Sequence, residues 1–539
     1  MIWAPLLAAL GVLLSWLYVT LRRSRSRYRD FPQLPNSFLF GHLKAFDQAM
    51  RTGIPDRDGH PDQVFLAIHE KLGRPPLFLV DFWPVRVPML IVCDHDMAEQ
   101  ISKMSNLFPW STPKADVTSH LDHLLGPTNI LSLQGHEWKQ TRRKFNYSFS
   151  HQNLSSCIPT IVDKAGIFLR NLDHFAATQQ DFSLMKMATN LTFDVIGAVV
   201  MDMDLNAQCL DEAEQGELVS LHLDLIESFT GAHAESASWM APQKVMKRRR
   251  LGNRINELVD DIILETKKKI EHDPEYASKS VLANRLRTAS DAPELPNETR
   301  DQIKIFLVAG HDTTSIMLSF AFYELSRSPR ILAALRAELD DLFGPETDPS
   351  VVQAKLRGPD GEGLLGKMEY VSAVIKEVLR LYPPAGTART SRTGTNFQVT
   401  SPSDGKTYCL DGPTLYTCNT IIHRDRNVYG ENANEFVPER WLGSAAKEIP
   451  ASAWRAFERG PRNCIGQELA NLEARVVIAL VARKYDFVKV GLGGFVLDEK
   501  DRPVLGEDAR VKTQSNMYNI LQITSKPADG MMMKVKLAN

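Results

Sequence analysis

The spacing of hydrophobic and polar residues predicts helices through the middle of the chain and short strands nearer its ends. Apolar residues recur at intervals of three and four, the period of an amphipathic helix, in several long segments. These segments are residues 215–230, 248–272, 298–327 and 330–342. Short strand-like runs occupy residues 77–80, 89–92 and 521–524. We therefore expect a mainly α protein with small β-sheets.

Residues 2–21 form an apolar run of twenty residues without a charge. At 1.5 Å per residue, a helix of this length spans the roughly 30 Å hydrocarbon core of a bilayer. A cluster of arginines follows the run, and the positive-inside rule places such a cluster on the cytosolic side. A cleaved signal peptide is the alternative, but its apolar run is usually about 7 to 15 residues long and follows its charges. We expect residues 2–21 to be a transmembrane anchor that leaves the rest of the chain in the cytosol.

The remaining chain shows one boundary, close to the anchor. Residues 22–40 are basic and contain Pro32 and Pro35, which disfavour helix and predict a stiff linker. From residue 41 to residue 539 we find no repeat, low-complexity tract or Gly/Ser-rich linker. We therefore expect one large domain over residues 41–539.

The longest predicted helix has polar residues at its centre. Residues 298–328 would make a helix of about thirty residues, against a mean of about 11 to 12 in globular proteins. Its centre, FLVAGHDTTSIMLSF, is apolar except for residues 311–314. A buried polar group costs a few kcal/mol unless it is hydrogen-bonded. These four residues therefore need a functional or structural reason.

Composition narrows the function classes. With 63 basic and 65 acidic residues the net charge is -2, so no long-range field would draw the chain onto nucleic acid. The hydrophobic fraction of 43% indicates a folded protein. The six cysteines are scattered without a CxxC pair, which favours neither a zinc site nor a disulfide framework and fits a reducing compartment.

The segment FERGPRNCIG, residues 457–466, carries the most chemical information. Its glycines let the backbone approach something flat and bulky, and the Cys464 thiolate is a ligand for a soft or borderline metal. The amides after the cysteine, and a helix that starts at Gly466, would stabilise the thiolate charge. A lone cysteine is otherwise a small buried hydrophobe. A haem iron satisfies both the glycines and the thiolate.

This segment resembles the FxxGxRxCxG haem-binding signature of the cytochrome P450 family. The five fixed positions are Phe457, Gly460, Arg462, Cys464 and Gly466. A chance match at all five is on the order of one in ten thousand. The resemblance implies the cytochrome P450 fold, a haem b whose iron is held by the Cys464 thiolate, and an ion pair from Arg462 to a haem propionate.

Further segments resemble the same family, in the family's order. Glu377 and Arg380 match ExxR, and Arg440 lies in FVPER, so the resemblance implies a buried structural charge network beneath the haem-binding loop. Trp138 and Arg142 resemble the WxxxR pair that contacts haem propionates.

The resemblance also implies a further propionate-binding arginine and the residues that activate oxygen. Arg389 lies after Pro383-Pro384, where family members often place another propionate-binding arginine. AGHDTT, residues 309–314, resembles (A/G)Gx(D/E)T(T/S), which implies that Asp312 and Thr313 deliver protons for oxygen activation. The structural alternative is a helix kink in which the threonine hydroxyls bond to the helix backbone. We assign His311 no catalytic role.

The resemblance implies a monooxygenase that uses O2 and NADPH. No flavin or nicotinamide fingerprint occurs here, so the expected electron donor is a separate NADPH-cytochrome P450 reductase, with cytochrome b5 as an optional second donor. The amino-acid sequence of several segments is most similar to fungal microsomal P450 enzymes that act in secondary metabolism. This implies an endoplasmic reticulum membrane protein with a cytosolic catalytic domain that oxidises a lipophilic polyketide or terpenoid.

Other functions stay open at this point. A haem-thiolate isomerase or dehydratase would act without a reductase and would not need the Asp312 and Thr313 pair. A fatty-acid or xenobiotic hydroxylase would share the chemistry, and a haem carrier or sensor would need no substrate pocket.

Family-like placement suggests where substrate and electron donor would bind. The expected pocket segments are residues 108–129, 305–309, 385–387 and 523–525. Basic residues expected on the cysteine side, as contacts for an acidic donor, are Lys139, Arg143, Arg455 and Arg459.

Overall fold

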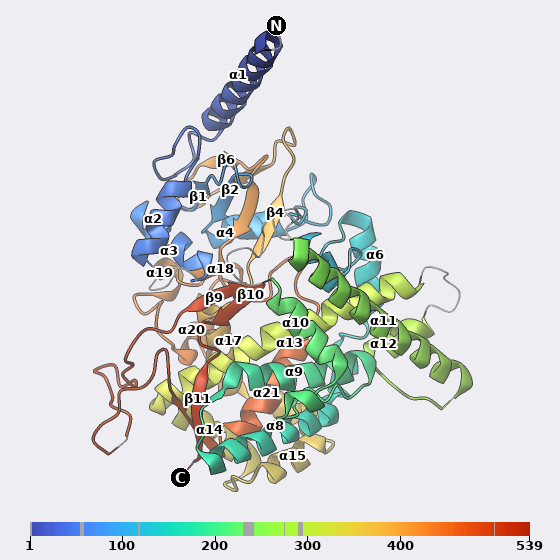
Figure 1. Cartoon of the computed structure of the whole chain (residues 1–539). Helices are drawn as coiled ribbons and strands as arrows, with labels where there is room; N and C mark the ends of the chain where they lie inside the picture. The colour runs from blue at the N-terminus through green and yellow to red at the C-terminus, as the bar shows by residue number, and fades with distance from the viewer. Residues whose placement is uncertain are drawn as a thin grey trace.

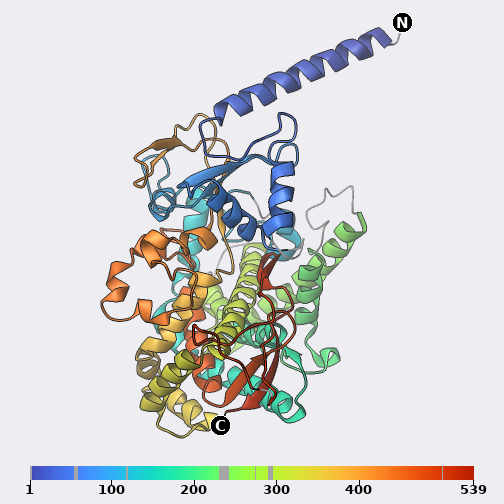
Figure 2. The same cartoon turned by 90° about the vertical axis from the view of Figure 1, so that its left-hand side faces the viewer.

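The computed structural model describes residues 3–53, 59–116, 119–229, 242–273, 275–288, 295–500 and 502–538. Helices form most of the body, and one short sheet lies at the end nearest the first helix (Figure 1). This confirms the predicted class, mainly α with small sheets. The first helix projects from one end of the body, and the C-terminus lies at the opposite end (Figures 1 and 2).

The helices follow the predicted segments, with shifted ends. The first half of the chain has α1 (Trp3–Arg27), α2 (Leu43–Gly53), α3 (Pro61–Lys71), α4 (His95–Ser102), α5 (Asp122–Leu125), α6 (Gly135–Asn146), α7 (His151–Ser155), α8 (Ile158–Thr178), α9 (Leu184–Met201), α10 (Glu217–Glu227) and α11 (Pro242–His272). The second half has α12 (Val281–Arg287), α13 (Leu295–Arg327), α14 (Pro329–Phe343), α15 (Pro349–Arg357), α16 (Gly361–Gly366), α17 (Glu369–Leu381), α18 (Asn419–Ile422), α19 (Arg426–Tyr429), α20 (Ala445–Glu448) and α21 (Gln467–Val481). The helix predicted over residues 215–230 ends at Glu227, and Thr230 lies outside the described residues.

The strands form sheets that join distant parts of the chain. They are β1 (Leu77–Val80), β2 (Met89–Val92), β3 (Phe182–Ser183), β4 (Thr387–Thr390), β5 (Gln398–Thr400), β6 (Thr407–Cys409), β7 (Thr414–Thr417), β8 (Tyr485–Lys489), β9 (Asn519–Gln522), β10 (Thr524–Pro527) and β11 (Met532–Leu537). The largest sheet has the order β1-β2-β7-β4, with β2 and β7 parallel. This order brings residues from both halves of the chain to the end of the body nearest α1 (Figure 1).

The prediction of one strand over residues 521–524 is wrong. The segment folds as an antiparallel hairpin in which β9 pairs with β10. Ile523 lies at the turn with a φ of 65°, in the left-handed region. An isoleucine between a glutamine and a threonine gives no turn signal, and this is why the pattern predicted a continuous strand.

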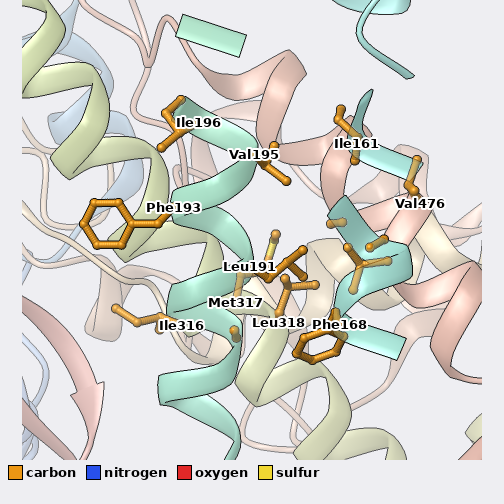
Figure 3. Packing of buried hydrophobic residues seen from close by; sticks show 14 of the residues in the cluster. Ile161, Phe168, Leu191, Phe193, Val195, Ile196, Ile316, Met317, Leu318 and Val476 are labelled. Atoms are coloured by element: carbon orange, nitrogen blue, oxygen red, sulfur yellow. The ribbon is translucent and has the colours of Figure 1, made fainter. Parts of the chain in front are cut away.

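The core lies where α13 crosses the body against α9. At 1.5 Å per residue, the 33 residues of α13 extend for about 50 Å. Apolar side chains of α9 and α13 interdigitate, and residues of α8 and α21 pack beside them (Figure 3). Gly310 of α13 allows this close approach, because a Cβ there would lie 2.6 Å from Ile196 of α9. The middle of α13 is therefore fixed in position.

Three helices in the described part of the chain are long and apolar enough to cross a membrane. Two of them, within α9 and α13, are 89% and 83% buried inside the body, and the third, residues 6–27, is 6% buried. The N-terminal helix is therefore the one whose apolar surface is free for lipid. Helix α1 continues through Arg27, beyond the apolar run that ends at residue 21.

Candidate active site

The loop before α21 holds Cys464 in a fixed position. The Cys464 amide donates to the Phe457 carbonyl at 2.8 Å, which closes the loop. Gly460 has a φ of 78°, and a Cβ on it would lie 2.2 Å from the Ser102 carbonyl oxygen. Gly466 is the N-cap of α21, so the thiol lies at the N-terminal end of that helix. Gly460 is therefore required for close packing against the Ser102 backbone, whereas a Cβ on Gly466 would lie 3.9 Å from the Cys464 sulfur, an ordinary contact distance.

The Cys464 side chain has accessible surface although it lies deep within the protein. Burial raises the pKa of the thiol, whereas hydrogen bonds from the Gly466 and Gln467 amides, and the charge of Arg142, lower it. A metal ion deprotonates a coordinating thiol, so these amides and Arg142 are arranged to stabilise a ligated sulfur.

Between residues 301 and 325, helix α13 is accessible only near its middle. Ala309 is exposed and Gly310 and Thr313 are partly exposed, whereas residues 301–308 and 314–325 are buried. A run of exposed small residues within a buried helix means that accessible space borders α13 inside the body. The Thr313 hydroxyl donates to the Ala309 carbonyl at 2.9 Å, within a helix that is continuous there.

Asp312 and Thr313 are neighbours but do not bond to one another. Asp312 is 1% exposed and faces β10, where the Thr524 hydroxyl donates to its Oδ2 and Lys526 Nζ lies 2.7 Å from its Oδ1. His311 stacks on Phe193 at 3.7 Å between ring centroids, and burial lowers its pKa to about 4. His311 is therefore neutral and part of the packing.

Arginines from α6 and β4 lie beside the Cys464 loop, which contributes Arg462 of its own. Arg142 of α6 donates from Nη1 to the Asn463 carbonyl at 2.7 Å. The Arg462 guanidinium lies 4.8 Å from the centre of the Trp138 ring and donates to carbonyls of residues 130, 131 and 133. Arg389 of β4 is fully buried, donates to the Thr112 carbonyl at 2.7 Å, and lies 3.6 Å from Glu458. All the predicted cofactor-binding residues thus come together around one loop.

The predicted charge network surrounds Glu377 of α17. Its carboxylate accepts two hydrogen bonds from Arg380 at 2.8 Å and one from Arg440 at 2.9 Å. The Val437 amide and the Trp441 indole complete its shell, both at 2.9 Å. Glu377 and Arg380 are fully buried, so the pair orders the segment of residues 423–441 rather than any substrate.

His423 links this network to the cysteine loop and was not predicted. Its ring nitrogens bond the Arg380 carbonyl at 3.1 Å and the Arg455 amide at 2.9 Å. Burial lowers its pKa to about 3, so the neutral ring donates from Nδ1 and accepts at Nε2. No local pattern marks this histidine, because its partners are 43 and 32 residues away.

Comparison with known proteins agrees with this geometry. The family model described as cytochrome P450 matches residues 32–495. The cytochrome P450 monooxygenase polC of Polytolypa hystricis is 30% identical over 478 residues, which cover 86% of this chain and 82% of the relative. The cytochrome P450 monooxygenase acrF of Aspergillus aculeatus is 28% identical over 522 residues, covering 89% and 98%.

This chain belongs to the cytochrome P450 family. A solved structure, the cytochrome P450DA heme domain, superposes with a TM-score of 0.70 over 94% of this chain and 98% of that one, at 18% identity. That likeness confirms the fold. Membership makes this protein a P450 monooxygenase, with haem held by a thiolate, a redox partner, O2 and a substrate.

The residues around Cys464 suit a haem. Within the described residues, Nε and Nη2 of the buried Arg389 have no hydrogen-bond partner. Among the described residues, Arg142, Arg462 and Lys114 form no ion pair and Arg389 pairs with Glu458, whereas Arg455 pairs with both Glu458 and Glu99. Burial raises the pKa of Glu458, but Arg455, Arg389 and Lys114 outweigh it and hold that pKa at about 2. Two propionates would satisfy the free donors and balance the excess positive charge. Ala309 of α13 and Cys464 both have accessible surface.

Lys114 is a further cation of this P450 site that the sequence did not reveal. Its backbone bridges to Arg389, and its ammonium donates to the Thr387 hydroxyl. Burial, together with Arg389 and Arg462, lowers its pKa to about 7. Lys114 lies in an irregular segment without a motif, and only the pairing with β4 brings it to the site.

The lowered pKa of Lys114 should make the free energy of unfolding depend on pH. Its folded pKa of about 7 is below the 10.5 of a free lysine, so the folded chain binds fewer protons between these values. The stability of haem-free protein should therefore rise with pH from about 7 to 10.5. Urea unfolding at several pH values would show a weaker rise for Lys114→Met and an unchanged one for Lys71→Met, a change at an exposed lysine. Haem loading should also weaken the rise if propionates pair with Lys114, and equal slopes with and without haem would contradict that pairing.

One predicted surface residue is misplaced. Arg455, expected among the surface contacts for an electron donor, is 1% exposed and bonds to Glu99, Ser102 and Glu458. A charged residue is usually on the surface, but here carboxylates compensate its burial. Lys139 and Arg143 are exposed and Arg459 is partly exposed, so they stay candidates.

Proposed function

We propose that Cys464 ligates the iron of haem b and that this protein uses O2 and NADPH-derived electrons to oxidise a lipophilic small molecule. The observation that carries the proposal is the accessible thiol at the N-terminus of α21, within a set of cations that lacks matching carboxylates. When bound, the haem supplies the oxygen-activating chemistry. Residues of the chain would bind the haem, deliver protons and bind the substrate.

In this proposal, the haem is held from three sides. The Gly466 and Gln467 amides and the end of α21 stabilise the thiolate charge. Arg142, Arg389, Arg462 and Lys114 neutralise the propionates, and Trp138 supports Arg462. Glu377, Arg380 and Arg440 would keep the segment of residues 423–441, and through His423 the Cys464 loop, in place.

Protons are proposed to reach the oxygen-binding face through Asp312 and Thr313. Thr313 borders the accessible stretch of α13, and Asp312 is the adjacent buried acid. An alcohol and an acid at this position pass a proton inward while apolar neighbours exclude bulk water.

The substrate is proposed to be a lipophilic secondary metabolite, such as a polyketide or terpenoid. Ala309, Ala385 and Gly386, in two of the expected pocket segments, are exposed, and Ile523 is partly buried. Small and aliphatic residues of this kind suit an apolar ligand. In the expected segment of residues 108–129, residues 117 and 118 lie outside the described part of the chain.

We further propose that α1 anchors the protein in the endoplasmic reticulum membrane with the domain in the cytosol. Arg25 pairs with Asp81, and Arg27 donates to the Asp411 carbonyl at 3.0 Å, so the basic end of the helix is attached to the domain. Phe38, Leu39 and Phe40 are exposed beside it, and the Tyr18 and Phe38 rings are 5.6 Å apart. Electrons would come from NADPH-cytochrome P450 reductase, with cytochrome b5 as a second donor.

Deleting residues 2–19 should make the protein extractable from membranes by alkaline carbonate, because most of the lipid-facing surface is removed. The deletion keeps Leu21, which is buried, and the contacts of Arg25 and Arg27. The haem-to-protein ratio of the extracted variant should therefore equal that of the full chain. Equal extraction of the full chain would contradict the anchor.

Reconstitution tests the catalytic proposal. Purified full-length protein with reductase and NADPH should couple oxygen uptake to oxidation of some member of a lipophilic compound library. If no member is oxidised while organic hydroperoxides are rearranged without reductase, the protein is an isomerase or dehydratase instead. Metabolite profiling after deletion of the coding sequence would identify the natural substrate.

A further inference from the structure

Both carboxylate oxygens of Asp312 are held by strand β10. The Thr524 hydroxyl donates to Oδ2, and Lys526 Nζ lies 2.7 Å from Oδ1. In the part of the chain that the structure describes, no other cation forms an ion pair with Asp312. The contact joins residues more than 200 positions apart, so no local sequence pattern could predict it.

Asp312 depends on this contact because it is 1% exposed. A buried carboxylate stays charged only where a cation and hydrogen-bond donors replace the lost water. The adjacent His311 supplies no charge, since its pKa is lowered to about 4 by burial, and its Nδ1 bonds the Leu307 carbonyl at 2.8 Å. Lys526 is therefore the compensating charge.

The β9–β10 hairpin is itself fixed in place. The Ser525 amide donates to the Pro384 carbonyl at 2.9 Å, and the Asn519 side chain donates to the Ser525 hydroxyl at 2.8 Å. Pro384 precedes Ala385 and Gly386, which are exposed at the expected pocket. The Lys526 side chain is 13% exposed, so one edge of the ion pair reaches solvent. The hairpin thus connects the pocket wall, solvent and Asp312.

We propose that Lys526 and Thr524 are positioning residues that keep Asp312 charged and oriented for proton delivery through Thr313. Lys526 lies on the solvent side of the ion pair and compensates the charge of the carboxylate. Thr524 fixes the second oxygen and so the carboxylate plane. The inference rests on the proposed monooxygenase function and adds residues outside the distal helix to it.

Turnover of the full-length, haem-loaded protein with reductase tests the proposal. Lys526→Met should keep NADPH consumption but lower product formed per NADPH by about tenfold, with peroxide released in its place. Lys526→Arg should restore most of the product yield, because it keeps the charge. Lys534→Met is the matched control, since Lys534 lies on the next strand, is 47% exposed and pairs with Asp181.

A pH profile separates positioning from general damage. The pH range of coupled oxidation should move in Lys526→Met and stay in Lys526→Arg and Lys534→Met, because only the first removes the cation beside the acid. A merely structural role would lower the yield equally at every pH. Product per NADPH equal to wild type in Lys526→Met at all pH values would overturn the proposal.

Urea unfolding tests the pairing without turnover. Lys526→Met should lower the unfolding midpoint, and adding Asp312→Asn should recover part of the loss, because no buried charge is then left unpaired. Additive effects would overturn the pairing. The wild type could show no NADPH-dependent oxidation while the unfolding midpoints of the single and double variants are non-additive. In that case the proposed function fails, but the ion pair between Lys526 and Asp312 is supported.

Discussion

Glu377→Gln should leave almost no haem-loaded protein. Glutamine removes the charge that balances Arg380 and Arg440, and its amide group would face their donors. Removing one partner of a buried ion pair costs about 3 to 5 kcal/mol, against a total stability of about 5 to 15 kcal/mol. The damage also spreads, because Arg380 donates to the carbonyls of His423 and Ala433 at 2.6 and 2.5 Å.

Soluble yield and the haem-to-protein ratio measure this loss. Glu369→Gln is the matched control, since Glu369 is exposed on the same helix α17. It should leave both quantities unchanged. A Glu377→Gln protein that accumulates and binds haem as the control does would show that the network is dispensable.

Thr313→Ala should uncouple the enzyme rather than unfold it. The Thr313 hydroxyl bonds only to the Ala309 carbonyl among the described residues, so its loss leaves no buried charge unpaired. NADPH consumption should continue while product per NADPH falls about tenfold or more, the scale of losing a positioned proton-transfer group. The missing product should appear as hydrogen peroxide.

Product, peroxide and NADPH measured in one reaction give the result directly. Thr313→Ser keeps the hydroxyl and should stay close to wild type. Unchanged coupling in Thr313→Ala would remove Thr313 from the proton route and leave Asp312 to act by another path.

Local patterns predicted the elements that position the site. The runs at residues 77–80 and 89–92 form β1 and β2 with the predicted ends, because each is a short apolar run whose residues are buried, apart from the partly buried Met89. The length of α13 and its polar centre were also readable, since helical spacing runs unbroken to Pro329. The cysteine segment was predictable because its glycines, arginine and thiol are contiguous.

Contacts between distant segments could not be read from the sequence. Lys114 reaches the site because it pairs with β4, and His423 because the ordered segment of residues 423–441 folds under α17. Lys526 was missed because the β9–β10 turn at Ile523 has no turn residue. Arg455 was placed on the surface because charge usually means exposure, yet Glu99 and Glu458 compensate its burial.

The carbon monoxide spectrum of the reduced protein tests the central claim, that the Cys464 sulfur ligates the haem iron. The wild type should show the strongly red-shifted Soret band that a thiolate ligand gives, and Cys409→Ala, a change at an exposed cysteine, should show it equally. Cys464→Ala should lose the band. Haem-loaded wild-type protein without it, or a Cys464→Ala protein that keeps it, would contradict the account.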